Sequence, residues 1–210
     1  MTHSPADSGT TAWQRTHYCG EIGTGDVGKE VILVGWAMHW RDFGGLVFVD
    51  LRDRTGIAQV VFNPQHAPEA HTKAREIRSE FLLGIRGTVQ RRPENAINPE
   101  LPTGEVEIAV AELRIVNTAK TLPFQIEEEK GEVSETLRLK YRYLDLRRPR
   151  LQRNFIIRHR VNQITRNYLS NHGFLELETP FLIKSTPEGA RDYLVPSRLY
   201  PGRFFALPQS

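Results

Sequence analysis

The chain has 210 residues, of which 39% are apolar and 25% are charged, and its formal net charge is +3. This composition supplies enough apolar residues for a core, and its charge imbalance is too small for general disorder. No apolar run approaches the roughly 18 residues that a membrane span needs, so we expect no transmembrane segment. The single cysteine, Cys19, excludes an internal disulfide and favours a reducing, cytoplasmic compartment. Without paired Cys or His-x-Glu spacing we expect no metal site.

The first residues of the chain are rich in Ser, Thr, Pro and Gly. They contain neither the basic n-region nor the apolar h-region of a signal peptide. We therefore predict a disordered tail over residues 1–13.

Five strand-like segments and one helix follow this tail. The segments rich in β-branched and aromatic residues are 31–37, 46–51, 57–62, 82–89 and 106–116. Between the third and the fourth, a helix from Pro68 is predicted by apolar residues at helical spacing, namely Ala70, Ala74, Ile77 and Phe81. Three strands, a helix and two strands form the order of the OB-fold, a five-stranded Greek-key barrel. We predict an all-β OB-fold barrel over residues 14–120.

The second and third strands of an OB-fold form its oligonucleotide-binding face. Phe48 offers a ring on which a base stacks, and Gln59 offers a donor and an acceptor to a base edge. The alternative for Phe48 is a place in the barrel core, because aromatic residues in strands are usually buried. Strand alternation puts Phe48 on the same face as Asp50, which favours the solvent side.

The second half of the chain begins with a linker and a long helix. The linker, residues 121–150, contains Pro123 and an acidic run at 127–129. After Pro149 a helical stripe of apolar residues runs for about 20 residues up to Gly173. Residues 174–177 then predict a strand.

A basic segment overlaps this helix. Residues 138–166 contain ten Lys or Arg and one acid, Asp145. Such a segment either neutralises phosphates of a nucleic acid or forms a solvated face with internal ion pairs. The sequence leaves both interpretations open.

Several long motifs resemble those of bacterial-type aspartyl-tRNA synthetases, in the same order and at the same spacing. They are residues 18–20 (YCG), 35–36 (GW), 48–53 (FVDLRD), 140–149 (KYRYLDLRRP), 173–180 (GFLELETP) and 186–198 (TPEGARDYLVPSR). The resemblance covers the chain from about Trp13 to its last residue. It implies an OB-fold anticodon-binding domain, a hinge and, over residues 151–210, the start of an α+β class II synthetase catalytic domain.

The resemblance also implies roles for single residues. The positions of Phe48 and Gln59 engage the central anticodon base in this family, and the position of Glu107 reads the first. A carboxylate accepts from the N1 and N2 donors of guanine, although a strand carboxylate in water is the plain alternative for Glu107. Arg41 is a candidate for the third base or a phosphate. The resemblance therefore favours a stacking role for Phe48.

In the second domain, the helix and strand through Pro180 resemble class II motif 1, which implies a homodimer interface. Residues 185–192 resemble the loop that closes over L-aspartate, with Glu188 accepting from its α-ammonium. The plain alternative for Glu188, beside Pro187, is a turn residue.

The family's ATP and Mg²⁺ sites come from motifs 2 and 3, which this sequence does not contain. The resemblance thus implies an aspartate–tRNA ligase that forms aspartyl-adenylate, with tRNA(Asp) and possibly tRNA(Asn) as substrates. We expect the 210-residue chain itself to carry no catalytic residue and to be inactive. The alternative is a stand-alone tRNA-binding module without catalysis.

Overall fold

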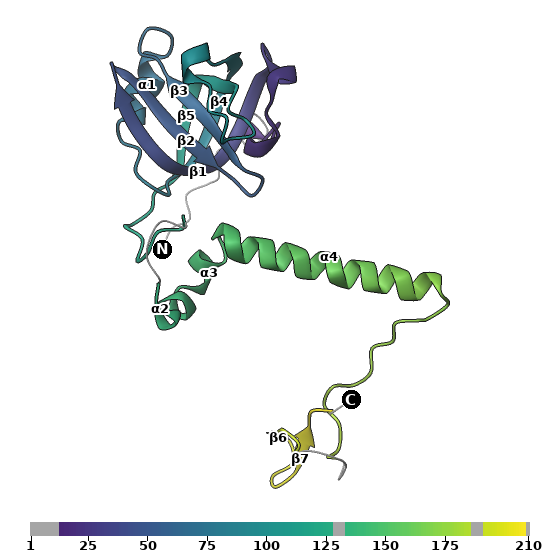
Figure 1. The fold of residues 1–210 in the computed structure, drawn as a ribbon. Coiled ribbons are helices and arrows are strands. Elements are labelled where there is room, and N and C mark those ends of the chain that lie inside the picture. The colour runs from purple at the N-terminus through teal and green to yellow at the C-terminus, as the bar shows by residue number, and fades with distance from the viewer. Residues whose placement is uncertain (1–12, 128–132, 186–190, 209–210) are drawn as a thin grey trace. The chain divides into compact units, whose positions relative to one another are not determined.

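The computed structural model describes residues 13–127, 133–185 and 191–208. The chain divides into two compact units between Pro123 and Phe124 (Figure 1). The predicted tail at residues 1–12 lies outside the described residues. Trp13, which we assigned to that tail, is described: its ring lies 4.4 Å from the Arg114 guanidinium and 5.0 Å from that of Arg86.

The first unit is a closed five-stranded barrel with the strand order β1-β2-β3-β5-β4. Its strands are β1 (Glu30–Phe43), β2 (Leu46–Arg52), β3 (Ile57–Phe62), β4 (Leu82–Arg91) and β5 (Val106–Asn117). The β3–β5 pair is parallel, and the other pairs are antiparallel. This topology confirms the predicted OB-fold. Two short 3-10 turns, Cys19–Glu21 and Thr24–Asp26, precede β1, and a third, Glu94–Ala96, follows β4.

The barrel core follows from strand alternation, since every second side chain of a strand points to the same face. In β2, Val47, Val49 and Leu51 are fully buried, and β1, β3, β4 and β5 contribute similar apolar residues. Phe48 and Leu46 lie on the other face of β2 and are not part of this core. The prediction that Phe48 faces away from the core is therefore confirmed.

The helix α1 (Pro68–Ala74) is shorter than the apolar stripe predicted. Ile77 is still buried but lies beyond its end. After the helix, Arg78 Nη1 donates to the carbonyl oxygens of Arg75 and Ile77, both at 2.8 Å. Glu80 then takes a positive φ of 64°, which a helix does not allow.

The described residues of the second unit form three helices and a two-stranded sheet. The helices are α2 (Glu135–Lys140), α3 (Arg142–Asp145) and α4 (Pro149–Asn171), and the strands are β6 (Leu194–Pro196) and β7 (Phe204–Ala206). The long helix after Pro149 is thus confirmed. The predicted strand at 174–177 is wrong, because a strand needs a pairing partner and the described residues provide none there. No helix of the described residues is both long and apolar enough to cross a membrane.

Asp145 accounts for part of the basic segment. This carboxylate is completely buried, and three arginines of the segment surround it. Arg138 and Arg142 each bond to it at 3.1 Å, and Arg148 lies 3.9 Å away. These three arginines form the internal ion pairs of the second interpretation, so they neutralise a carboxylate of the chain itself.

Candidate nucleic-acid interface

Four polar residues lie side by side across the outer face of the barrel, one on each of four neighbouring strands. Asp50 of β2 pairs with Gln59 of β3, and Gln90 of β4 pairs with Glu107 of β5. The parallel pairing of Val60 with Ile108 places Gln59 beside Glu107. We call Asp50, Gln59, Glu107 and Gln90 the polar row.

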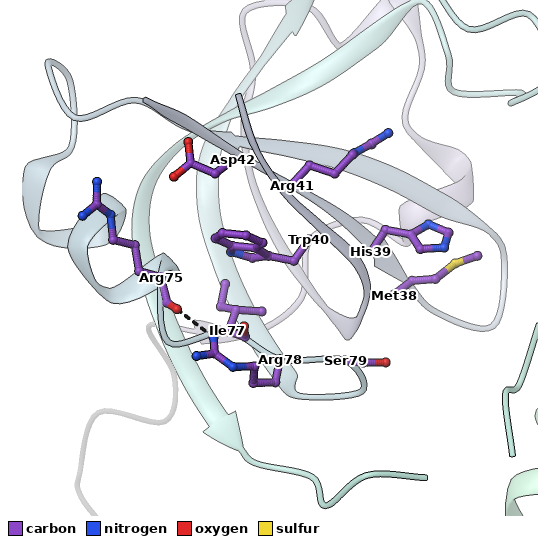
Figure 2. Close-up of a pocket in the computed structure, with 9 residues that line it drawn as sticks. All are labelled: Met38, His39, Trp40, Arg41, Asp42, Arg75, Ile77, Arg78 and Ser79. Atoms are coloured by element: carbon purple, nitrogen blue, oxygen red, sulfur yellow. Dashed lines mark hydrogen bonds between the residues drawn. The ribbon is translucent and has the colours of Figure 1, made fainter. Parts of the chain in front are cut away.

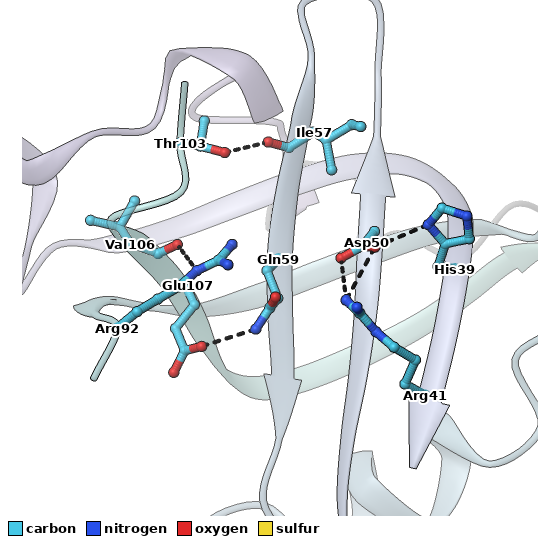
Figure 3. A network of polar contacts seen from close by, with 9 residues as sticks. All are labelled: His39, Arg41, Asp50, Ile57, Gln59, Arg92, Thr103, Val106 and Glu107. Atoms are coloured by element: carbon cyan, nitrogen blue, oxygen red, sulfur yellow. Dashed lines mark hydrogen bonds and ion pairs between the residues drawn. The ribbon is translucent and has the colours of Figure 1, made fainter. Parts of the chain in front are cut away.

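Glu107 is the centre of the polar row and is only 7% exposed. Its Oε2 accepts from Gln59 Nε2 at 3.1 Å, as Figure 3 shows, and its Oε1 accepts from Gln90 Nε2 at 2.8 Å. The two amides therefore hold the carboxylate in one orientation. A carboxylate has about four acceptor positions, so it retains the capacity to accept from a ligand.

Phe48 borders a pocket of about 350 Å³ next to the polar row. The pocket is also lined by Gln59, Glu107 and Gln90, and by apolar side chains that include Leu46 and Val61. Phe48 is half-buried and pairs with Val61 across the β2–β3 ladder, so the two side chains lie on the same face. The pocket thus combines an aromatic ring with donors and acceptors, which is what stacking and edge recognition of a base require.

Arg41 lies at the β1 end of the same face and does not line this pocket. Its Nη2 is 3.0 Å from Asp50 Oδ1, and His39 Nδ1 is 3.1 Å from Asp50 Oδ2 (Figure 3). Asp50 is 9% exposed, whereas Arg41 and His39 are exposed. The ion pair places the exposed Arg41 guanidinium at the Asp50 end of the polar row.

A buried arginine, Arg92, lies close enough to the polar row to attract its two carboxylates. Arg92 is 6% exposed, and its Nε donates to the carbonyl oxygen of Val106 at 2.9 Å. Burial lowers the pKa of Arg92, while attraction to Glu107 and Asp50 opposes that shift. The positive charge of Arg92 therefore offsets the two buried carboxylates of the face.

Two family models match the chain. Residues 31–116 match the OB-fold nucleic acid binding domain, and residues 134–210 match tRNA synthetases class II (D, K and N). An aspartate–tRNA(Asp/Asn) ligase from Geotalea uraniireducens is 61% identical over 94% of this chain and 33% of its own length. A relative of the same name from Syntrophotalea carbinolica is 59% identical over the same shares. The chain therefore carries an OB-fold nucleic acid binding domain and, after it, a segment that matches the class II tRNA synthetase (D, K and N) model. It spans about a third of the length of these curated relatives.

Solved structures agree with this assignment. The asparaginyl-tRNA synthetase from Pyrococcus horikoshii, complexed with asparaginyl-adenylate, has a TM-score of 0.78 and 27% identity over 94% of this chain and 43% of its own. A putative aspartyl-tRNA synthetase from Leishmania major has a TM-score of 0.79 at 23% identity, over 99% of this chain and 41% of its own, and shows the fold.

The barrel brings three of the four expected anticodon residues, Phe48, Gln59 and Glu107, to one pocket. Sequence reasoning missed Gln90 and Arg92, which hold and neutralise Glu107. Both lie near the start of the long loop between β4 and β5, so the sequence could not fix their register with β5. Their polar character at the end of a strand was the one available signal.

The other two expected site residues, Pro180 and Glu188, belong to the second unit. Pro180 is exposed and lies outside regular structure. Glu188 lies outside the described residues. The residues that the structure describes contain no cluster of three or more His, Cys, Asp or Glu that could hold a metal ion.

Proposed function

We propose that the outer face of the barrel binds the anticodon of tRNA. In this proposal Phe48 stacks on the central anticodon base and Gln59 bonds to its edge. Glu107 accepts from a guanine at the first position. The observation that carries the proposal is that these three residues, distant in sequence, border one pocket on the face that OB-folds use for oligonucleotides. Arg41 contributes to the third base or to a phosphate.

We further propose that the whole protein is a cytoplasmic aspartate–tRNA ligase. It attaches L-aspartate to tRNA through an aspartyl-adenylate and uses ATP and Mg²⁺. Residues 14–120 are its anticodon-binding domain, 121–150 its hinge and 151–210 the start of its catalytic domain. Glu188 accepts from the α-ammonium of aspartate, since charge-assisted bonds to ammonium groups are strong. The 55–61% identity to aspartate–tRNA(Asp/Asn) ligases supports this activity.

The names of these relatives also support tRNA(Asn) as a second substrate beside tRNA(Asp). The two tRNAs then share the contacts to Phe48, Gln59 and Glu107. A second copy of the chain is the proposed partner of the second unit, with Pro180 at the interface of a homodimer.

The test of anticodon binding uses an RNA hairpin that carries the aspartate anticodon. Phe48→Ala removes the ring and is expected to weaken binding by about 1–3 kcal/mol, the usual value of one base stack. Phe48→Leu is the matched control for packing, because it keeps an apolar side chain but has no flat face. We expect Phe48→Leu to bind nearly as weakly as Phe48→Ala while both variants melt near the temperature of the unchanged chain.

Wild-type affinity in a folded Phe48→Ala chain would contradict the proposal. Fluorescence anisotropy of a labelled hairpin measures each Kd, and a hairpin with a scrambled anticodon measures the sequence-independent part.

A further inference from the structure

A second pocket, separate from the one that Phe48 borders, lies along the edge of β1. It has a volume of about 860 Å³ and is shown in Figure 2. One wall is formed by residues 38–42 of β1, and the other by Arg75 and residues 77–79, which follow α1. Side chains that point to opposite faces of β1, such as Trp40 and Arg41, both line it. The pocket therefore follows the strand edge, and we call it the edge groove.

The edge groove exists because β1 is longer than its partner on that side. Pairing with β4 covers only Glu30–Trp36, whereas β1 continues to Phe43 and pairs there with β2 alone. Over its last residues β1 therefore presents an unpaired sheet edge within the described part of the chain. Such an edge offers backbone N–H groups to a ligand.

The charge of the edge groove is positive. Arg41, Arg75 and Arg78 line it, and Asp42 is the acid among its lining residues. Arg75 is exposed, and its guanidinium makes no hydrogen bond or ion pair with the described residues. Arg78 uses one nitrogen, Nη1, for the carbonyls of Arg75 and Ile77 (Figure 2). Its planar fork carries further N–H donors for a second acceptor.

The groove walls are fixed to each other. Glu80 N donates to the Ala37 carbonyl oxygen at 2.6 Å, and Ala37 N donates to that of Phe81 at 2.9 Å. The Glu80 carboxylate accepts from Arg52 Nη2 at 2.7 and 2.8 Å, and Trp40 Nε1 donates to the Ala74 carbonyl oxygen at 2.9 Å. A ligand therefore meets walls that are already in place, which lowers the entropy cost of binding.

We propose that the edge groove binds the phosphodiester backbone of the tRNA strand that leaves the anticodon pocket. The inference rests on the proposed anticodon function. Arg41 connects the two sites, because it lines the groove and also pairs with Asp50 at the end of the polar row. Three arginines complement a polyanion, and planar guanidinium groups match the geometry of phosphate oxygens. Backbone contacts of this kind position the RNA without reading its sequence.

The experiment measures hairpin affinity as a function of salt for the full chain. Arg75→Glu reverses a charge that makes no internal contact, and Ser79→Glu adds a carboxylate to the same wall. For each variant we expect the Kd to rise by about five-fold at low salt and the slope of log K against log salt to fall by about one. We expect the same rise in Kd for the hairpins with the aspartate and the scrambled anticodon, because the contact is to phosphate.

Two controls isolate the groove. Arg75→Lys keeps the charge and is expected to bind nearly as well as the unchanged chain. Arg54→Ala removes an exposed arginine on the β2–β3 turn, which stacks on Tyr18 at 4.5 Å and does not line the groove. We expect it to leave the affinity unchanged.

The outcomes separate this inference from the function on which it rests. Unchanged affinity and salt slope in both Arg75→Glu and Ser79→Glu, with weaker binding in Phe48→Ala, would overturn the inference and leave the anticodon proposal intact. Weaker binding in the groove variants with unchanged binding in Phe48→Ala would support the groove and contradict the anticodon pocket.

Discussion

At the scale of single residues, Glu107 is a buried carboxylate that the barrel holds in one orientation. Two amides fix its oxygens, and the positive charge of Arg92 lies close by. A buried carboxylate without such partners would be costly. The arrangement orients the Glu107 carboxylate before any ligand arrives.

This arrangement predicts the effect of Glu107→Gln. The neutral amide has fewer acceptor positions and turns a donor toward Gln59, Gln90 or the base. We expect the preference for guanine at the first anticodon position to fall by about 10–100-fold, which corresponds to about 1.5–3 kcal/mol for hydrogen bonds to a charged group. Competition between hairpins that differ at this base measures the preference.

Glu105→Gln is the control, because Glu105 is exposed and lies just before the same strand. It should keep the full preference for guanine. A Glu107→Gln chain that also keeps it would show that Glu107 is an ordinary strand carboxylate.

At the scale of elements, Asp53 fastens the segment before β1 to the β2–β3 turn. Its Oδ2 accepts from the Cys19 N–H, and its Oδ1 accepts from the N–H of Thr55, both at 2.8 Å. Burial raises the pKa of Asp53, but the hydrogen bonds together lower it by more. The pKa of Asp53 therefore lies below the usual value of 3.8. The carboxylate form is therefore favoured in the folded chain.

Asp53 thus contributes stability that is present above its unfolded pKa and is lost as the pH falls through the lower folded pKa. We expect Asp53→Asn to destabilise the chain by about 1–2 kcal/mol at pH 7, the typical value of a charge-assisted bond to backbone. The difference from the unchanged chain should shrink below about pH 4, where Asp53 begins to protonate in the unfolded state. Urea unfolding between pH 3 and pH 7 measures this dependence, and a difference that stays constant would argue against it.

Much of the barrel was predictable from the sequence, because β-branched runs and turn residues mark its strands locally. The β3 range matches, and β1, β2, β4 and β5 extend beyond the predicted ends. The ends of a strand depend on its hydrogen bonds to neighbouring strands, and the residues of the strand alone do not reveal those partners. The same reason explains why residues 174–177 looked like a strand but have no partner among the described residues. The end of α1 at Ala74 was not predictable, because Ile77 and Phe81 continue the helical spacing of apolar residues in a segment that is not helical.

The candidate site was predictable in part. Alternation placed Phe48 on the outer face, and residue chemistry suggested Gln59. The polar row depends on the register of four strands, including a parallel pair, so Gln90 could not be assigned from the sequence. The edge groove depends on the different lengths of β1 and β4, which no local pattern reveals.

At the scale of the whole molecule, the second unit exposes an apolar stripe along α4. Ile157, Val161, Ile164 and Tyr168 are 51–68% exposed, and no residue of α4 is buried. Exposed stripes of this size mark protein interaction surfaces. A second copy of the chain is the occupant that we propose.

We therefore expect self-association that depends on protein concentration. Ile164→Glu, in the centre of the stripe, should shift the chain toward the monomer in sedimentation velocity. Gln163→Glu adds the same charge on the next residue, about 100° around the helix, and should leave the association unchanged. An unchanged sedimentation profile for Ile164→Glu would contradict the proposed interface.

We propose above all that the barrel pocket bordered by Phe48, Gln59 and Glu107 holds unpaired nucleotides of the tRNA. The most direct measurement is an NMR titration of the labelled chain with the anticodon hairpin, which follows the Phe48 ring and the side-chain amides of Gln59 and Gln90. These amides already bond to Glu107, so a base that reaches the polar row must shift their resonances. We predict large, saturable shifts at these three side chains. Shifts confined to the basic residues of α4, with Phe48 and both amides unchanged, would contradict the claim.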